Sequence, residues 1–219
     1  MNPPKSLSDV ELAFLYWDNY ERGNDSFIKD LFCGQLMSKV RCGDCGEVST
    51  SFDVFWDLSL PVPVQEKTIH LDDLLRSFCE VEKMPADCGF KCESCKKTPV
   101  HGATKQFTIA KYPRVLVLHL KRFWHERAGT KKIVTPVTFP VKGLQAGHES
   151  YDLAAVVNHV GMFGSGHYTA DVYNPLTKTW FHADDTNFTP TTRIGVNGYL
   201  LFYVEARKAE RSMKTLCYA

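Results

Sequence analysis

The sequence has no long hydrophobic run and no excess of charge of one sign. No apolar stretch approaches the roughly 20 residues that span a bilayer, and the first residues lack the basic-then-apolar pattern of a signal peptide. Lysine plus arginine number 26 and aspartate plus glutamate 25, so neither nucleic acid nor a membrane surface is an expected partner. We therefore expect a protein partner and a location in the nucleus or cytoplasm, where disulfides are rare.

The residues that are present indicate a folded α+β protein with a largely antiparallel sheet. The 219 residues are 44% hydrophobic and 12% aromatic, which is enough to bury a sizeable core. A capping box at Ser8 and Glu11 predicts a helix up to Gly23, and leucine spacing predicts a short helix over residues 71–78. Alternation predicts one long strand over 48–60 with one buried face, and further strands over 104–111, 114–122, 151–160, 167–173, 178–183 and 198–204.

Two Cys-x-x-Cys pairs predict a metal site: Cys42 with Cys45, and Cys92 with Cys95. Each pair can turn two sulfur atoms toward one ion, and four thiolates complete the tetrahedron that zinc prefers. A closed site of this kind is structural, so we expect one zinc ion that ties together the ends of an inserted arm. Four free cysteines, or a redox dithiol, would be the alternatives.

A histidine after a glycine-rich loop is the strongest catalytic candidate. His167 follows Gly161, Gly164 and Gly166, and a hairpin would bring Asp184 within reach of its ring. A carboxylate there could fix the imidazole tautomer and stabilise its cation, as in a nucleophile–base–acid triad. Since neighbours in a strand point to opposite faces, only one of Asp184 and Asp185 should contact His167 directly.

Other histidine and basic side chains favour structural roles. His119 lies on an apolar strand face, which favours a core histidine with a backbone partner. Lys121, Arg122, Lys131 and Lys132 form no continuous patch, and we interpret them as a solvated loop surface that could meet an acidic partner.

Several segments together resemble the ubiquitin-specific protease family of deubiquitinases. These segments are 32–45, 52–61, Val115-Leu-Val-Leu-His-Leu-Lys-Arg-Phe123, Gly166-His-Tyr-Thr-Ala170 and Tyr199-Leu-Leu-Phe-Tyr203. The resemblance implies a papain-like fold of fingers, palm and thumb, with the zinc at the fingertips. It also implies that His167 is the general base, Asp184 its partner and Asp185 a helper. It divides the chain into residual thumb-side helices (1–35), zinc-binding fingers (36–108), a palm (109–205) and a C-terminal tail (206–219).

The resemblance also implies the substrate and reveals one departure from the family. Ubiquitin and ubiquitinated proteins, histones among them, are the implied partners, and cleavage after the C-terminal Gly-Gly of ubiquitin is the implied reaction. Family members begin with a segment in which Asn-Thr-Cys opens a helix, and this sequence has no such stretch. We therefore expect most of the thumb and the nucleophile to be missing, so that this chain alone is inactive. The alternatives are a non-catalytic ubiquitin-binding pseudoenzyme or scaffold and, less well supported, a purely structural zinc protein.

Overall fold

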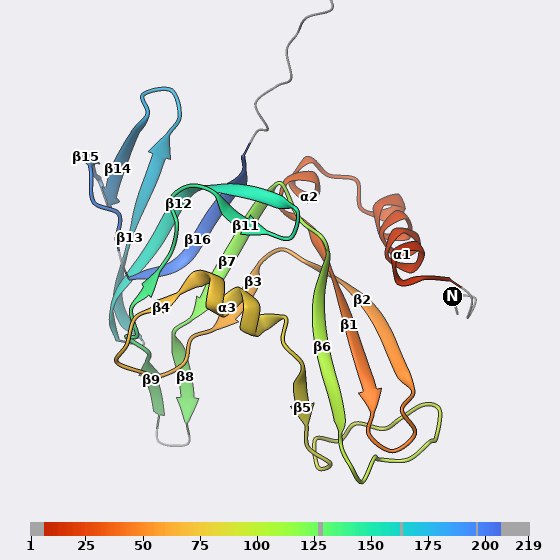
Figure 1. Cartoon of the computed structure of the whole chain (residues 1–219). Helices are drawn as coiled ribbons and strands as arrows, with labels where there is room; N and C mark the ends of the chain where they lie inside the picture. The colour runs from red at the N-terminus through yellow and green to blue at the C-terminus, as the bar shows by residue number, and fades with distance from the viewer. Residues whose placement is uncertain (1–6, 127–128, 163, 196, 207–219) are drawn as a thin grey trace, which may run out of the picture.

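The computed structural model describes residues 7–126, 129–162, 164–195 and 197–206 (Figure 1). The predicted tail, apart from Ala206, lies outside the described residues. Three helices occur in the described part: α1 (Asp9–Gly23), α2 (Phe27–Phe32) and α3 (Leu71–Phe78). Among these helices none is both long and apolar enough to cross a lipid bilayer.

The two predicted helices are confirmed. The Ser8 hydroxyl accepts a hydrogen bond from the Glu11 backbone N–H, and the Glu11 carboxylate accepts one from the Ser8 backbone N–H, so the capping box begins α1 as expected. In α3, Leu71 and Leu74 are buried on one face. The six residues of α2 are too few to give a periodic signal, and Ser26 caps this helix by accepting from the N–H groups of the second and third helical residues.

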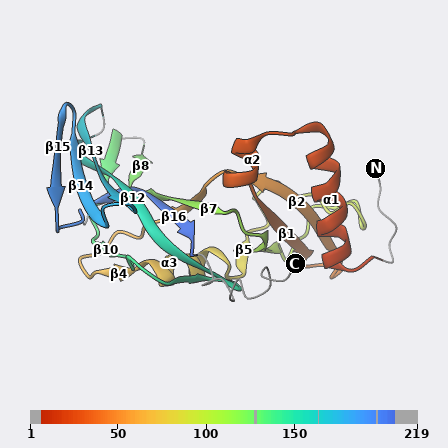
Figure 2. The ribbon, with the colours of Figure 1, turned by 90° about the horizontal axis from the view of Figure 1, so that it is seen from above.

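A four-stranded antiparallel sheet forms one end of the molecule. Its strand order is β2-β1-β6-β5. The helix α1 lies beside it, since the ring of Tyr16 stacks on Phe52 and Gln35 donates to the carbonyl of Ala13. Figure 2 shows both N-terminal helices at this end, away from β13, β14 and β15. The bounds are β1 Gly34–Cys42, β2 Val48–Phe55, β5 Glu82–Met84 and β6 Ala103–Lys111.

An eight-stranded sheet carries the core. Its order is β15-β14-β13-β12-β16-β7-β3, with β11 paired to β12, and only β3 runs parallel to its neighbour, β7. Leu58, Leu116, Tyr151 and Tyr203 are among its fully buried side chains. The bounds are β3 Leu58–Pro61, β7 Val115–Lys121, β11 Leu144–Ala146, β12 Glu149–Met162, β13 Ser165–Asn174, β14 Thr179–Asp184, β15 Asn187–Thr191 and β16 Gly198–Glu205.

Two short ribbons complete the described strands. One pairs β4 (Ile69–His70) with β10 (Val137–Thr138), and the other pairs β8 (Phe123–Glu126) with β9 (Gly129–Lys132). The six strands predicted in the C-terminal half are confirmed to within a few residues as β6, β7, β12, β13, β14 and β16.

The prediction of one long strand over 48–60 is wrong. The chain bends at Trp56 and Asp57, so that β2 belongs to the four-stranded sheet and β3 to the eight-stranded sheet. Only Phe55 of β2 is buried, because β2 is an edge strand. Alternation continues across the bend, and for this reason periodicity alone could not locate it. The range 36–108 assigned to the fingers consequently includes a segment, Leu58–Phe78, that packs on the other sheet.

Candidate catalytic pair and zinc site

Four cysteines meet where two turns face each other at the tip of the four-stranded sheet. All four Sγ atoms of Cys42, Cys45, Cys92 and Cys95 lie within 4.8 Å of one another, and those of Cys45 and Cys92 are 3.6 Å apart. A tetrahedral ion with bonds of about 2.3 Å to sulfur places its ligands about 3.8 Å from one another. The observed spacing therefore fits a zinc ion without rearrangement of the backbone.

The two turns are built alike. The residue after each second cysteine, Gly46 or Lys96, has a positive φ, 72° and 59° respectively. In each turn the first cysteine N–H donates to a carbonyl five residues later, Glu47 in one and Lys97 in the other. The N–H groups of Cys95 and Ser94, together with hydrogen bonds from the thiols of Cys45 and Cys95, lower the pKa of Cys92 to about 7, which favours the thiolate that a metal binds. The backbone of the second turn thus favours the thiolate form at Cys92.

His167 and Asp184 form a hydrogen-bonded pair on the eight-stranded sheet. The distance from His167 Nε2 to Asp184 Oδ1 is 2.5 Å, and about half of each side chain is exposed. The hydrogen bond to Asp184, then its charge, raises the pKa of His167 above the ordinary value. Asp184 occupies Nε2, so Nδ1 is the ring nitrogen left to accept a proton from a nucleophile.

Asp185 lies closer to His167 than strand alternation predicts. Its carboxylate oxygen is within 4.8 Å of the ligand atoms of both His167 and Asp184, and its charge also raises the pKa of His167. The strand β14 ends at Asp184, and Asp185 enters the turn to β15 with a φ of 48°. The turn brings the side chain back toward the histidine, although only Asp184 is hydrogen-bonded to it among the described residues.

The glycines before His167 are required by the hairpin between β12 and β13. Gly161 has a φ of 106°, and a Cβ there would lie 2.7 Å from the Ser165 carbonyl oxygen. At Gly166 a Cβ would lie 2.0 Å from Nε2 of His159. Two of these glycines therefore allow close approach within the hairpin itself, before any substrate is considered.

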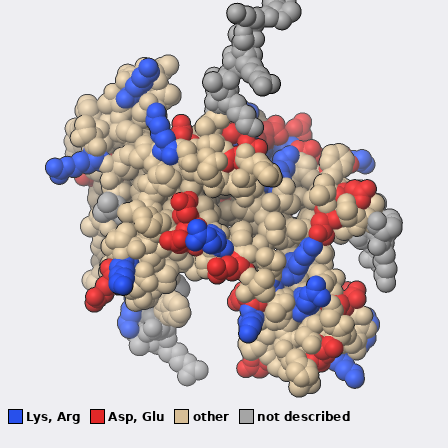
Figure 3. All heavy atoms as spheres, in the orientation of Figure 1, with Lys and Arg blue, Asp and Glu red and all other residues tan. Residues whose placement is uncertain are grey.

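His119 and Arg122 differ from the sequence-based interpretation. The Nδ1 atom of His119 is 3.0 Å from the Ser59 hydroxyl, so its partner is a side chain and not the backbone, and burial lowers its pKa. Arg122 is not part of a solvated surface, because it is only 3% exposed. Its guanidinium donates to the carbonyls of Ile133 and Thr135 in one segment and of Gly198 in another, and thereby ties both segments to its own. On the face drawn in Figure 3, basic and acidic side chains are interspersed.

A second histidine–carboxylate pair, Asp171 and His182, was not predicted. Asp171 Oδ1 lies 2.7 Å from His182 Nδ1, and Asp171 is 1% exposed. Strand parity could have indicated it: Asp171 is four residues after His167 on β13, and His182 is two residues before Asp184 on β14. The pair therefore lies on the same face as the catalytic candidates.

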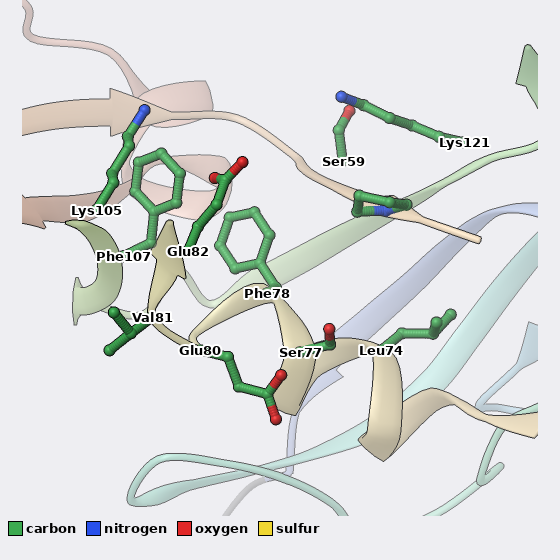
Figure 4. Close-up of a pocket in the computed structure, with 11 residues that line it drawn as sticks. Ser59, Leu74, Ser77, Phe78, Glu80, Val81, Glu82, Lys105, Phe107 and Lys121 are labelled. Carbon is green, nitrogen blue, oxygen red and sulfur yellow. The ribbon is translucent and has the colours of Figure 1, made fainter. Parts of the chain in front are cut away.

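One cavity lies away from the catalytic candidates. It measures about 450 Å³ and opens where α3 and β3 meet β5 and β6 (Figure 4). Phe78 and Phe107 stack at its wall, with ring centroids 5.5 Å apart. Neither His167 nor Asp184 lines it, so the catalytic candidates are defined by their own geometry and not by this cavity.

The histidine–aspartate pair on the eight-stranded sheet and the four-cysteine cluster at the tip of the four-stranded sheet are the two features that the resemblance to the thiol proteases of the ubiquitin-specific family implies. The family model "Ubiquitin carboxyl-terminal hydrolase" matches residues 4–203. The chain belongs to the ubiquitin carboxyl-terminal hydrolase family, as its sequence motifs predicted.

Individual relatives agree with this assignment. Ubiquitin carboxyl-terminal hydrolase 2 of Gallus gallus is 40% identical over 217 residues, which are 94% of this chain and 60% of that protein. Ubiquitin carboxyl-terminal hydrolase 21 of Homo sapiens is 37% identical over 211 residues, covering 90% of this chain and 37% of that protein. The chain thus spans between about a third and three fifths of the length of these relatives.

Solved structures share the fold. A yeast SAGA deubiquitinating module with an Sgf73 mutant has a TM-score of 0.72 and 31% identity, covering 87% of this chain and 45% of its own. The Ubp8/Sgf11/Sus1/Sgf73 module bound to ubiquitin aldehyde has a TM-score of 0.70 and 26% identity, covering 90% of this chain and 47% of its own. The predicted papain-like α+β fold is therefore confirmed.

Proposed function

We propose that this chain forms the fingers and palm of a ubiquitin-specific thiol protease, which in its intact form hydrolyses the isopeptide bond after the C-terminal Gly-Gly of ubiquitin. The observation that carries the proposal is the 2.5 Å contact between His167 Nε2 and Asp184 Oδ1, because it leaves Nδ1 available as a base. Family membership supplies the reaction class.

In the proposed reaction, His167 moves the protons. Nδ1 takes the proton of a cysteine thiol, and the thiolate attacks the carbonyl carbon of the scissile amide. The resulting imidazolium then protonates the lysine amine as it leaves, which forms an acyl-enzyme that water hydrolyses. Asp184 holds the ring in the required tautomer and stabilises its cation.

The proposed partners are ubiquitin and ubiquitinated proteins. The relevant support is that one structural neighbour is a deubiquitinating module bound to ubiquitin aldehyde and another is bound to monoubiquitin. Histones as substrates, and a nuclear or cytoplasmic location, are expectations from the family resemblance and extend the same proposal.

One structural zinc ion is proposed at Cys42, Cys45, Cys92 and Cys95. The mutual spacing of the sulfur atoms supports it, and all four coordination positions would be filled by protein. A bound zinc ion would connect the turn after β1 to the segment between β5 and β6, so its binding free energy would add to the stability of the four-stranded sheet.

A second candidate function is a ubiquitin-binding module without hydrolytic activity. Among the described residues, no cysteine is hydrogen-bonded to His167, whose ring is hydrogen-bonded to Asp184 alone. Cys33 is buried and lies 3.8 Å from the Tyr20 hydroxyl, and burial raises its pKa, so it is not an activated nucleophile. The enzyme proposal therefore needs a thiol from a segment that the described residues do not include.

Two measurements on the same protein separate these candidates. Calorimetric titration with ubiquitin should show binding under both, and turnover of ubiquitin carrying a C-terminal fluorogenic amide should occur only in a form of the protein that supplies the thiol. Turnover that His167→Ala abolishes would establish the enzyme. Binding with no turnover by the longest natural form would favour the binding module, and failure to bind ubiquitin at all would overturn both.

A further inference from the structure

Two histidine–carboxylate pairs stand side by side on one face of the β13–β14 hairpin. Asp171 and His182 are directly opposite each other in the register of these strands. Residues separated by an even number in a strand share a face, so Asp171 faces the same way as His167, and His182 the same way as Asp184. The pair Asp171–His182 lies within the paired part of β13 and β14, and the pair His167–Asp184 lies just beyond the end of that pairing.

Asp171 is a buried charge whose oxygen atoms are well satisfied. Oδ1 contacts His182, while Oδ2 accepts from Asn158 Nδ2 and from the Gly195 backbone N–H, each at 2.8 Å. Burial of a carboxylate is costly unless it is hydrogen-bonded in this way. The three donors come from β12, from β14 and from the segment after β15, so one carboxylate ties three elements together.

The end of β14 is paired on one side only, because Asp184 is opposite Asn187 of β15 but has no partner in β13. Pairing between β13 and β14 runs from Asn174 opposite Thr179 to Ala170 opposite Ala183, and it stops there. Asp184 is the next residue and the last of its strand, and the turn begins at Asp185. The bond between Asp171 and His182 is therefore a side-chain link between β13 and β14, just before the point where the pairing of these two strands ends.

We propose that Asp171 is a positioning residue that acts through His182 to hold Asp184 at hydrogen-bonding distance from His167. This inference rests on the proposed function, in which His167 is the general base. It adds Asp171 and His182, which would affect the reaction only through the position of Asp184. Misplacement of a catalytic group by about 1 Å can lower a rate by about 10²-fold.

The charges around the two rings allow the proposal to be tested by titration. His167 faces Asp184 and Asp185, which raise its pKa. On the other side, its partner in the β12–β13 pairing is the apolar residue Val160 of β12. His182 faces Asp171. The Asp171 carboxylate is thus bonded to His182, and its influence on His167 should pass through the position of Asp184.

The experiment follows the His167 imidazole of the zinc-loaded chain by NMR as a function of pH. Asp184→Asn serves as the reference and should lower the pKa of His167. Asp171→Asn and His182→Phe should each lower it by about 0.5 to 1 unit, because Asp184 is no longer held in place. His182→Asn should restore most of the original value, since its amide can donate to Asp171 as Nδ1 does.

A matched control separates positioning from general loosening. Asp152, on the neighbouring strand β12, accepts the Gly143 N–H through its carboxylate, and Asp152→Asn should leave the titration of His167 unchanged. The proposal is overturned if Asp171→Asn and His182→Phe leave the pKa of His167 at its original value, or if His182→Asn behaves as His182→Phe does. It is also overturned if Asp152→Asn changes that pKa or if the reference variant, Asp184→Asn, does not lower it. If Asp171→Asn does not fold, the two His182 variants decide. Ubiquitin binding and turnover do not enter this measurement, so the proposed function can fail independently of it.

Discussion

The imidazole of His159 lies directly against Gly166, the residue before the proposed base. A Cβ at position 166 would come within 2.0 Å of His159 Nε2, and His159 is only 4% exposed. The ring contacts Phe123 and Tyr168, with centroid distances of 5.2 and 4.7 Å, so it is packed on its other sides. The position of His167 is thus coupled to a buried histidine on the neighbouring strand.

Gly166→Ala should therefore destabilise the protein by about 1–3 kcal/mol, because neither the methyl group nor the packed ring can move away easily. Denaturant unfolding measures this change. Gly23→Ala is the control, since a Cβ at Gly23 meets nothing within 4 Å, and it should change the free energy of unfolding by less than about 0.5 kcal/mol. Equal effects of the two variants would contradict the role assigned to His159.

Much of the fold and of the site could be predicted from the sequence because the features concerned depend on residues that are close together in the chain. The capping box of α1, the strand alternation and the two Cys-x-x-Cys turns are such patterns, and the hairpin from His167 to Asp184 is nearly local. The break at Trp56 could not be predicted, since the chain changes sheets without any change in alternation. The burial of Arg122 depends on carbonyls up to 76 residues away, and such contacts leave no periodic signal.

Zinc binding should require Cys92. We expect one zinc per chain, and Cys92→Ser should reduce it to well below one equivalent and lower the unfolding temperature by about 5 °C or more, because zinc contributes to folding free energy. Metal analysis and calorimetry measure the two effects. Cys88→Ser should leave both unchanged, since Cys88 is exposed and lies outside the four-cysteine cluster. A fully folded chain that contains no zinc would refute the site.

The N-terminal helices should make this chain self-associate. Val10 and Phe14, four residues apart on α1, are 79% and 74% exposed, and Phe27 on α2 is 71% exposed. Apolar side chains gathered in this way favour association. Replacement of Val10 and Phe14 by glutamine should weaken the association by roughly tenfold or more, as measured by sedimentation. Leu176→Gln, in the β13–β14 turn, should not weaken it, and a monomeric chain at high concentration would contradict the prediction.

Asp184 should control the ionisation of His167 more strongly than Asp185 does. Asp184→Asn removes the charge of the bonded carboxylate and leaves at most a weaker, neutral hydrogen bond, so the pKa of His167 should fall further than in Asp185→Asn. Because folding raises this pKa, the pair stabilises the fold below the ordinary histidine value of about 6.5, and the contribution disappears as the pH rises through the raised value. NMR titration of both variants measures the difference, and equal shifts would mean that the two carboxylates share the role.

Residues 1–219 alone should not hydrolyse ubiquitin derivatives, although the proposed base, His167, and its proposed orienting acid, Asp184, are within hydrogen-bonding distance of each other. A base without a thiol beside it can accept a proton, but no acyl-enzyme can form because there is no nucleophile. Of the described cysteines outside the metal cluster, Cys33 is buried, and burial also raises the pKa of Cys79, so both remain protonated near neutral pH. A fluorogenic ubiquitin amide should therefore show no turnover above that of the His167→Ala variant. A thiol-reactive ubiquitin probe should likewise leave Cys33, Cys79 and Cys88 unlabelled, as peptide mapping would show. Labelling at one of these residues that depends on His167 would identify a nucleophile that the geometry of the described residues does not provide.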